Sequence, residues 1–241
     1  MKYLVFVFIC SVIAILLLPV FLLRPRNVRN TILLGRPCQI VSSIIGIEWI
    51  IKGAENIPKD ESCVIMSNHQ SCLDAIGLFH VNPIFRRTTV VVKKELLYAI
   101  PFGTCLWLCG IIFLSRTHSE KSKHTLNDTL KTLKREKTNI WIYPEGTRRS
   151  DGRIHEFKKG GFHMALSAHL PILPVVYSAY DFVNHEEKKF GRGKVVITIL
   201  PPISTKGKSM EDIESLMAET RNKMSETFQE INNLKMNKVE I

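Results

Sequence analysis

The stretch Ser67-Asn68-His69-Gln70-Ser71-Cys72-Leu73-Asp74 holds an imidazole and a carboxylate five positions apart, directly after an apolar run. On a continuous helix, five positions turn about 140° around the axis, so the two side chains would point apart. The apolar run Cys63-Val64-Ile65-Met66 is typical of a short buried strand, and the residues from Ser71 to Phe79 predict a helix. His69 is therefore expected in a strand-to-helix turn, where Asp74 can accept a hydrogen bond from its ring.

Two interpretations of this pair are open. In the first, Asp74 holds one nitrogen of the His69 ring and the other nitrogen acts as a base, because a free imidazole has a pKa of about 6.5. In the second, Ser71 and Asp74 form a capping box, in which the carboxylate only satisfies a backbone N–H at the start of the helix.

A second stretch, Trp141-Ile142-Tyr143-Pro144-Glu145-Gly146-Thr147-Arg148, repeats this arrangement. An apolar strand breaks at a proline and a glycine and presents an acidic and a basic side chain in the turn. Arg148 is a candidate phosphate ligand, because a guanidinium forks onto two oxygens. The alternative is a surface ion pair of Arg148 with Glu145 or Asp151.

Together, Asn68-His69-Gln70-Ser71-x-x-Asp74 and Pro144-Glu145-Gly146-Thr147-Arg148 resemble the paired signatures of the glycerophospholipid acyltransferase family. Two weaker blocks occur in the expected order, Gly110 to Arg116 between the main motifs and Leu173-Pro174-Val175-Val176 after them. The resemblance runs from about residue 55 to 180 and is strongest to the 1-acylglycerol-3-phosphate acyltransferases.

The resemblance implies direct transfer of an acyl group from acyl-CoA to the sn-2 hydroxyl of 1-acylglycerol 3-phosphate (lysophosphatidic acid), giving phosphatidic acid for phospholipid synthesis. His69 would be the base and Asp74 its orienting partner. Backbone N–H groups of the turn after His69 are expected to bind the oxyanion.

Several further residues are candidates for binding the substrates. Glu145 is expected to orient Arg148 or the acceptor glycerol, and Lys93 to bind the CoA phosphates. Ser115 departs from the family pattern, because many relatives have an acid there, which leaves the role of the neighbouring arginine open. The substrate-binding candidates are Glu145, Gly146, Thr147, Arg148, Arg116 and Lys93.

Other functions compete with this interpretation. They are acylation of another lysophospholipid or of glycerol 3-phosphate, hydrolysis by a membrane-bound enzyme that uses His69 and Asp74, and membrane binding without catalysis. The Glu-Gly-Thr-Arg turn argues against a hydrolase, which does not need a second phosphate-binding turn.

Composition favours anionic partners. The 241 residues include 33 basic and 22 acidic side chains, a net charge of +11, which suits acyl-CoA and acidic membrane lipids. No nucleic-acid-binding motif accompanies the charge. The six cysteines show no C-x-x-C spacing and the eight histidines no H-E-x-x-H pattern, so we expect reduced thiols, no metal and no cofactor.

The N-terminal region predicts a membrane anchor. Tyr3 to Leu23 is a run of 21 uncharged residues, long enough to span a bilayer, and four arginines follow it within a short distance. The positive-inside rule then places the remaining chain in the cytosol. The resemblance implies the endoplasmic reticulum for a eukaryotic source, with a bacterial inner membrane as the alternative. Cys38 to Ile51 is expected to be an amphipathic element at the headgroups or an ordinary core helix.

The rest of the chain alternates between strand and helix patterns. This predicts an α/β domain with a mixed, mostly parallel sheet flanked by helices over residues 53–241, after an anchor and interfacial segment over residues 1–52. Leu96 to Phe113 is uncharged over 18 residues, but Pro101 and two glycines divide it. We expect a broken helix and a strand there, which line an acyl-chain groove or belong to the core.

Overall fold

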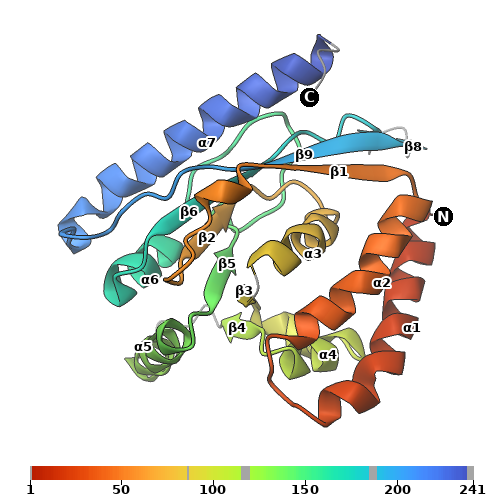
Figure 1. Cartoon of the computed structure of the whole chain (residues 1–241), viewed down its shortest axis with the longest axis horizontal. Helices are drawn as coiled ribbons and strands as arrows, with labels where there is room; N and C mark the ends of the chain where they lie inside the picture. Colours follow the sequence, from red (N-terminus) through yellow and green to blue (C-terminus); the bar gives the residue numbers. More distant parts are fainter. Residues whose placement is uncertain (1, 86, 115–119, 185–188, 238–241) are drawn as a thin grey trace.

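A seven-stranded sheet lies at the centre of the computed structural model, which describes residues 2–85, 87–114, 120–184 and 189–237. The strand order is β1-β9-β6-β2-β5-β3-β4 (Figure 1). Neighbouring strands pair in parallel except β6 and β9, so β9 and β1 run against the other strands. The predicted mixed, mostly parallel α/β sheet is confirmed. The strands are β1 (Ile47–Lys52), β2 (Val64–Ser67), β3 (Thr88–Lys93), β4 (Ile112–Leu114), β5 (Asn139–Ile142), β6 (Ile172–Tyr177) and β9 (Gly193–Ile199), with a separate hairpin of β7 (Val183–Asn184) and β8 (Lys189–Phe190).

Helices cover both faces of the sheet, as predicted from the alternating pattern (Figure 1). The α-helices are α1 (Lys2–Leu22), α2 (Asn30–Ile44), α3 (Asp74–Phe85), α4 (Phe102–Leu108), α5 (Glu120–Arg135), α6 (Gly160–Ala168) and α7 (Ile213–Met236). Short 3-10 helices are η1 (Ala54–Asn56), η2 (Lys94–Tyr98) and η3 (Met210–Asp212).

Strand β2 shows how the sheet divides the core. Val64 and Met66 point to the face covered by α5, α6 and α7, whereas Ile65 points to the face covered by α3. All three side chains are fully buried, because successive strand residues alternate between two covered faces. The continuous apolar run before His69 is therefore explained by the central position of β2, which is covered on both faces.

The predicted membrane span, Tyr3 to Leu23, is not confirmed. Within the described ranges, no helix combines the length and the apolar character needed to cross a membrane. In the described part of α1, some apolar surface is used in packing. Ala14 and Phe21 are fully buried and lie in one cluster with Cys105 and Leu108 of α4.

The prediction of one amphipathic element over Cys38 to Ile51 is wrong in its second half. Helix α2 ends at Ile44, and Gly46 follows with φ of +85°, a conformation that glycine adopts without steric cost and that ends the helix. From Ile47 the chain is β1, which pairs in parallel with β9. The run Leu96 to Phe113 is broken as predicted, into η2, α4 and β4.

Helix α3 approaches the sheet closely at Gly77. A Cβ atom there would lie 2.3 Å from Cε1 of Tyr177 and 2.6 Å from Cζ3 of Trp49, far inside ordinary contact. Because Asp74 is the first residue of this helix, the fit at Gly77 also sets the position of the carboxylate.

Gly77→Ala tests this close approach. Helix propensity alone would stabilise the protein by about 1 kcal/mol, whereas overpacking costs about 1–3 kcal/mol, so we expect a net loss in the free energy of unfolding. Chemical denaturation measures it. Gly160→Ala is the matched control, because a Cβ there meets nothing within 4 Å, and it should leave stability unchanged or raise it. A stabilised Gly77→Ala protein would contradict the packing described.

Candidate active site

Both sequence motifs lie at the same edge of the sheet. Strands β2 and β5 are parallel neighbours, so the turn after Ser67 and the turn after Ile142 emerge together. Strand β3 is parallel to β5 and ends at Lys93 on that edge. In open α/β sheets, the carboxyl ends of parallel strands are where ligands bind.

Two amides hold the turn after β2 against β6. The side chain of Asn68 donates to the carbonyl of Tyr177 (3.0 Å) and accepts from its N–H (2.8 Å). The Gln70 side chain donates to the carbonyls of Tyr177 and Ser178. Both amides are buried, so the residues flanking His69 serve to fix the turn in place.

The side chains of His69 and Asp74 meet, as predicted for a bent chain. Nδ1 of His69 lies 2.6 Å from Oδ2 of Asp74. An ionised carboxylate only accepts hydrogen bonds, so Nδ1 carries the proton and Nε2 keeps its lone pair. The His69 side chain is 18% exposed and that of Asp74 is 0% exposed, so the imidazole reaches solvent while its partner does not.

The Asp74 carboxylate does both things that the sequence pattern suggested. Besides the His69 ring, Oδ2 accepts from the backbone N–H groups of Gln70 (2.8 Å) and Ser71 (3.0 Å), as a capping carboxylate would. Oδ1 accepts from the hydroxyl of Tyr180 (2.7 Å). Orientation of the imidazole and capping of α3 are thus one network rather than two alternatives.

This network occupies the first backbone N–H groups of the turn, which were expected to bind the oxyanion. The N–H groups of Gln70 and Ser71 are directed to Asp74, and the N–H of His69 is donated to Oε1 of Glu145 (2.8 Å). The physical reason is that two buried carboxylates, Asp74 and Glu145, require hydrogen-bond donors and take these N–H groups.

Glu145 joins the two turns instead of facing a substrate. Its Oε1 accepts from the His69 N–H and its Oε2 from the His155 N–H (3.0 Å). The N–H of Arg149 in turn donates to the carbonyl of His69 (2.9 Å). Burial raises the pKa of the Glu145 carboxyl, and the two backbone hydrogen bonds oppose this rise. The predicted roles of orienting Arg148 or the acceptor do not fit this geometry.

The turn leaves the guanidinium of Arg148 in solvent. Neither proposed acidic partner pairs with it, because Glu145 is used by backbone amides and Asp151 bonds to His155 and Arg153. Thr147 beside it is also exposed. Arg148 is therefore exposed at the same sheet edge as His69.

The remaining predicted residues differ in how they are placed. Gly146 adopts φ of +67°, and a Cβ there would lie 2.9 Å from Nζ of Lys158, so this lysine side chain covers the turn. Lys93 is exposed at the end of β3. Arg116 lies outside the described residues.

Two tyrosines complete the site and were not predicted. The ring of Tyr143 stacks on that of His69, with centroids 4.0 Å apart and planes at 19°. Burial, with the charge of Asp74 as a second cause, raises the pKa of Tyr143 well above its usual range, so the phenol stays protonated. The position of Tyr143 just before the Pro-Glu-Gly turn was an available signal. Tyr180 lies 106 positions from Asp74, so no local sequence pattern indicated their contact.

Comparison with known proteins identifies the family of this chain. A family model described as Acyltransferase matches residues 48–178, more than half of the chain. Over 220 residues the chain is 36% identical to the 1-acyl-sn-glycerol-3-phosphate acyltransferase alpha of Homo sapiens, a match that covers 91% of this chain and 77% of the relative. The chain belongs to the 1-acyl-sn-glycerol-3-phosphate acyltransferase family. It is accordingly an acyltransferase.

Other members of the family are similar to this acyltransferase. The 1-acyl-sn-glycerol-3-phosphate acyltransferase of Saccharomyces cerevisiae is 34% identical, covering 80% of this chain and 63% of the relative. The crystal structure of the 1-acyl-sn-glycerophosphate acyltransferase of Thermotoga maritima superposes with a TM-score of 0.61 at 24% identity, covering 83% of this chain and 79% of that one. At that identity, the likeness shows a common fold.

Glu145→Gln tests whether this carboxylate holds the two turns together. The amide keeps one acceptor oxygen but turns an NH2 group toward one backbone N–H, which leaves a buried donor unsatisfied at a cost of about 1–3 kcal/mol. We expect lower stability by chemical denaturation and a lower kcat. Glu156→Gln is the control, because Glu156 is exposed, and it should change neither. Full stability of Glu145→Gln would refute the joining role.

Proposed function

We propose that this acyltransferase moves an acyl group from acyl-CoA to the free sn-2 hydroxyl of 1-acylglycerol 3-phosphate and forms phosphatidic acid. One observation carries the proposal. A partly exposed His69 ring, held through Nδ1 by the buried Asp74, shares one sheet edge with an Arg148 whose guanidinium is in solvent. The names of the relatives, which specify acylation of 1-acyl-sn-glycerol 3-phosphate, support the acceptor.

The proposed reaction follows from the protonation pattern of the site. Nε2 of His69 removes the proton of the sn-2 hydroxyl while the hydroxyl oxygen attacks the carbonyl carbon of the thioester. A C–O bond forms, and a tetrahedral intermediate results. The C–S bond then breaks, and the imidazolium returns the proton to the leaving thiolate of CoA. Asp74 stabilises the imidazolium between these two steps.

Arg148 gives the acceptor site its proposed selectivity. A guanidinium binds two oxygens of a phosphate monoester at once, whereas an exposed ammonium acts as a point charge. The Lys158 side chain over Gly146 adds positive charge beside the same turn. Lys93, exposed at the end of β3, is proposed to bind the phosphates of CoA.

We also propose that the enzyme works at a cytosol-facing membrane, in the endoplasmic reticulum as the family resemblance implied. An acceptor with a fatty acyl chain resides in a bilayer, and large apolar side chains of α1 and α2 are exposed, among them Leu16, Ile40 and Ile44. Fractionation of cells that express the chain tests this proposal, and recovery of the protein outside the membrane fraction would contradict it.

Replacing either member of the catalytic pair should abolish transfer. His69→Ala removes the base, so the rate should fall at least about 10²-fold without loss of folding. Asp74→Asn should cost comparably, because the amide favours the wrong tautomer of the imidazole. Thiol release from acyl-CoA in the presence of acceptor measures the rate, and thermal unfolding checks the fold. His163→Ala on the exposed face of α6 is the control. Near-normal turnover by folded His69→Ala protein would overturn the mechanism.

Arg148→Lys separates phosphate recognition from general charge. The lysine keeps the charge but loses the bidentate geometry, so KM for lysophosphatidic acid should rise while KM for acyl-CoA changes little. Arg153→Lys, in the exposed part of the same loop, is the matched control. An equal rise of both KM values would show a general electrostatic role. Assays with lysophosphatidylcholine and glycerol 3-phosphate then test the acceptor assignment.

A further inference from the structure

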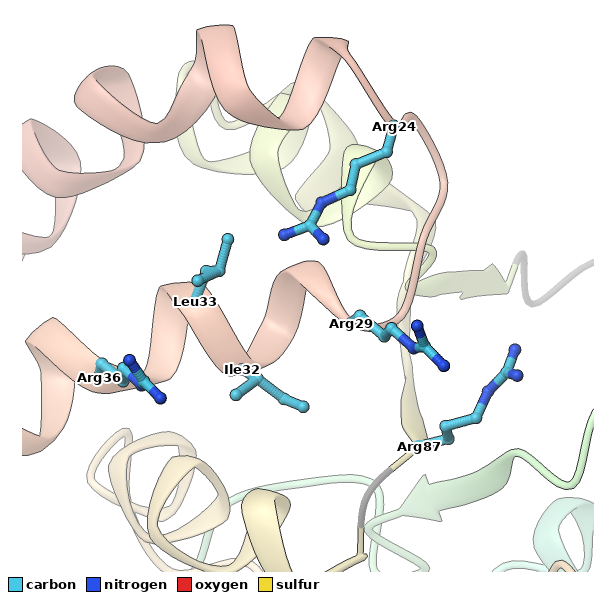
Figure 2. Close-up of a pocket in the computed structure, with 6 residues that line it drawn as sticks. All are labelled: Arg24, Arg29, Ile32, Leu33, Arg36 and Arg87. Atoms are coloured by element: carbon cyan, nitrogen blue, oxygen red, sulfur yellow. The ribbon is translucent and has the colours of Figure 1, made fainter.

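A hollow of about 400 Å³ lies between the connection of α1 to α2 and the start of β3. Figure 2 shows guanidinium groups from three parts of the chain around it: the segment between α1 and α2, helix α2 itself and the residue before β3. Its volume lies in the range of small-ligand pockets. The lining consists of Arg24, Arg29, Ile32, Leu33, Arg36 and Arg87.

The charge in this arginine pocket is largely unbalanced. Among the described residues, Glu136 is the carboxylate that pairs with the lining, at 2.8 Å from Arg87. Nε of Arg24 is buried and has no hydrogen-bond partner in the described part of the chain. Guanidinium groups gathered around one hollow repel one another, so an anion between them would be strongly stabilised.

The backbone around the pocket is held in place before any ligand arrives. The side chain of Asn30 donates to the carbonyls of Arg24 (3.1 Å) and Leu108 (3.0 Å), and the N–H of Asn27 donates to Leu108 as well (3.1 Å). These bonds tie the connection between α1 and α2 to the end of α4. Such preorganisation lowers the cost of binding.

The pocket is separate from the catalytic edge. Arg87 immediately precedes β3, whereas Lys93 ends it, and a strand of this length spans about 20 Å. Because β3 runs parallel to β2, Arg87 lies at the amino edge of the sheet and His69 at the carboxyl edge. A phosphate in the arginine pocket is therefore not the phosphate of an acceptor that reacts at His69.

Apolar side chains next to the pocket indicate where its ligand comes from. Leu22 and Leu23, which directly precede Arg24, are 63% and 87% exposed. Trp107 is 38% exposed, and the guanidinium of Arg26 lies over its ring at 5.5 Å. Exposed leucines and a tryptophan beside arginines are the combination found where a protein lies at a bilayer surface. A free phosphate would gain nothing from these apolar neighbours.

We propose that the arginine pocket binds the phosphate of an anionic phospholipid headgroup and thereby seats the enzyme on the membrane surface. Two guanidinium groups grip the phosphate oxygens, and the neighbouring apolar side chains contact the acyl region. This site does not depend on acyl transfer, so the test below is independent of the proposed function.

Vesicle sedimentation tests the proposal with the full chain. The probes are vesicles of phosphatidylcholine with and without phosphatidylglycerol, a lipid that is neither substrate nor product of the proposed reaction. Arg24→Gln combined with Arg36→Gln should weaken binding to the anionic vesicles, by about fivefold for each arginine. Lys59→Gln combined with Lys206→Gln removes the same charge from exposed sites elsewhere and should weaken binding much less.

Glu136→Gln provides a test in the opposite direction. It releases Arg87 from its carboxylate partner, so binding to anionic vesicles should become tighter. The proposal is overturned if the arginine and lysine pairs of substitutions weaken binding equally, if Glu136→Gln has no effect, or if inorganic phosphate at low concentration displaces the vesicles. Turnover of substrates dispersed in detergent should stay unchanged in all these variants, which keeps a failure here distinct from a failure of the catalytic proposal.

Discussion

Asp74 carries a carboxylate that is 0% exposed at the first residue of α3, and a charge so placed is stable only when its oxygens are hydrogen-bonded. The donors come from two parts of the chain: the turn after β2 supplies the imidazole and two backbone N–H groups, and the segment after β6 supplies the Tyr180 hydroxyl. Satisfying this one charge therefore fixes the start of a helix, the path of a turn and the tautomer of His69 together. The arrangement of His69 and Asp74 thus follows from the hydrogen bonds that a buried carboxylate requires.

Glu145 repeats the principle in the neighbouring turn. Its two oxygens bind the backbone N–H groups of His69 and His155, so the turns after β2 and β5 are joined by a side chain rather than by the sheet alone. Stacking of Tyr143 on the imidazole then restricts the plane of the ring. Both carboxylates are thus used in support, whereas the His69 ring is partly exposed and Arg148 is exposed. A site whose polar groups are mostly held by hydrogen bonds suits a reaction that depends on the precise positioning of the reacting groups.

Features that depend on local patterns could be predicted from the sequence. Apolar runs at β2 and β5 indicated buried strands, and the meeting of His69 with Asp74 followed from the bend that their spacing required. Features that depend on distant contacts could not. Tyr180 reaches Asp74 across 106 positions, and the pairing of β1 with β9 joins segments that are far apart in the sequence. The capping box did indicate that Asp74 accepts from a backbone N–H, but the sequence could not show that the Gln70 and Ser71 N–H groups both point to Asp74, because the direction of a backbone donor cannot be read from a sequence. The burial of Glu145 was not predicted, because a glutamate three positions before Arg148 suggests a surface ion pair.

The double use of Asp74 has a consequence for how the enzyme loses activity. Local unfolding usually begins at helix ends, where few contacts oppose fraying, and catalytic groups on mobile loops can be released while the core persists. Here the carboxylate that holds the His69 ring belongs to the residue that begins α3, and three residues later Gly77 packs against aromatic rings of the sheet. Freeing the His69 ring from Asp74 would require disrupting the start of α3 and would leave the buried carboxylate without its hydrogen-bond donors. The candidate site thus belongs to the same cooperative unit as the core, and partly unfolded forms that keep α3 intact would also keep His69 and Asp74 aligned.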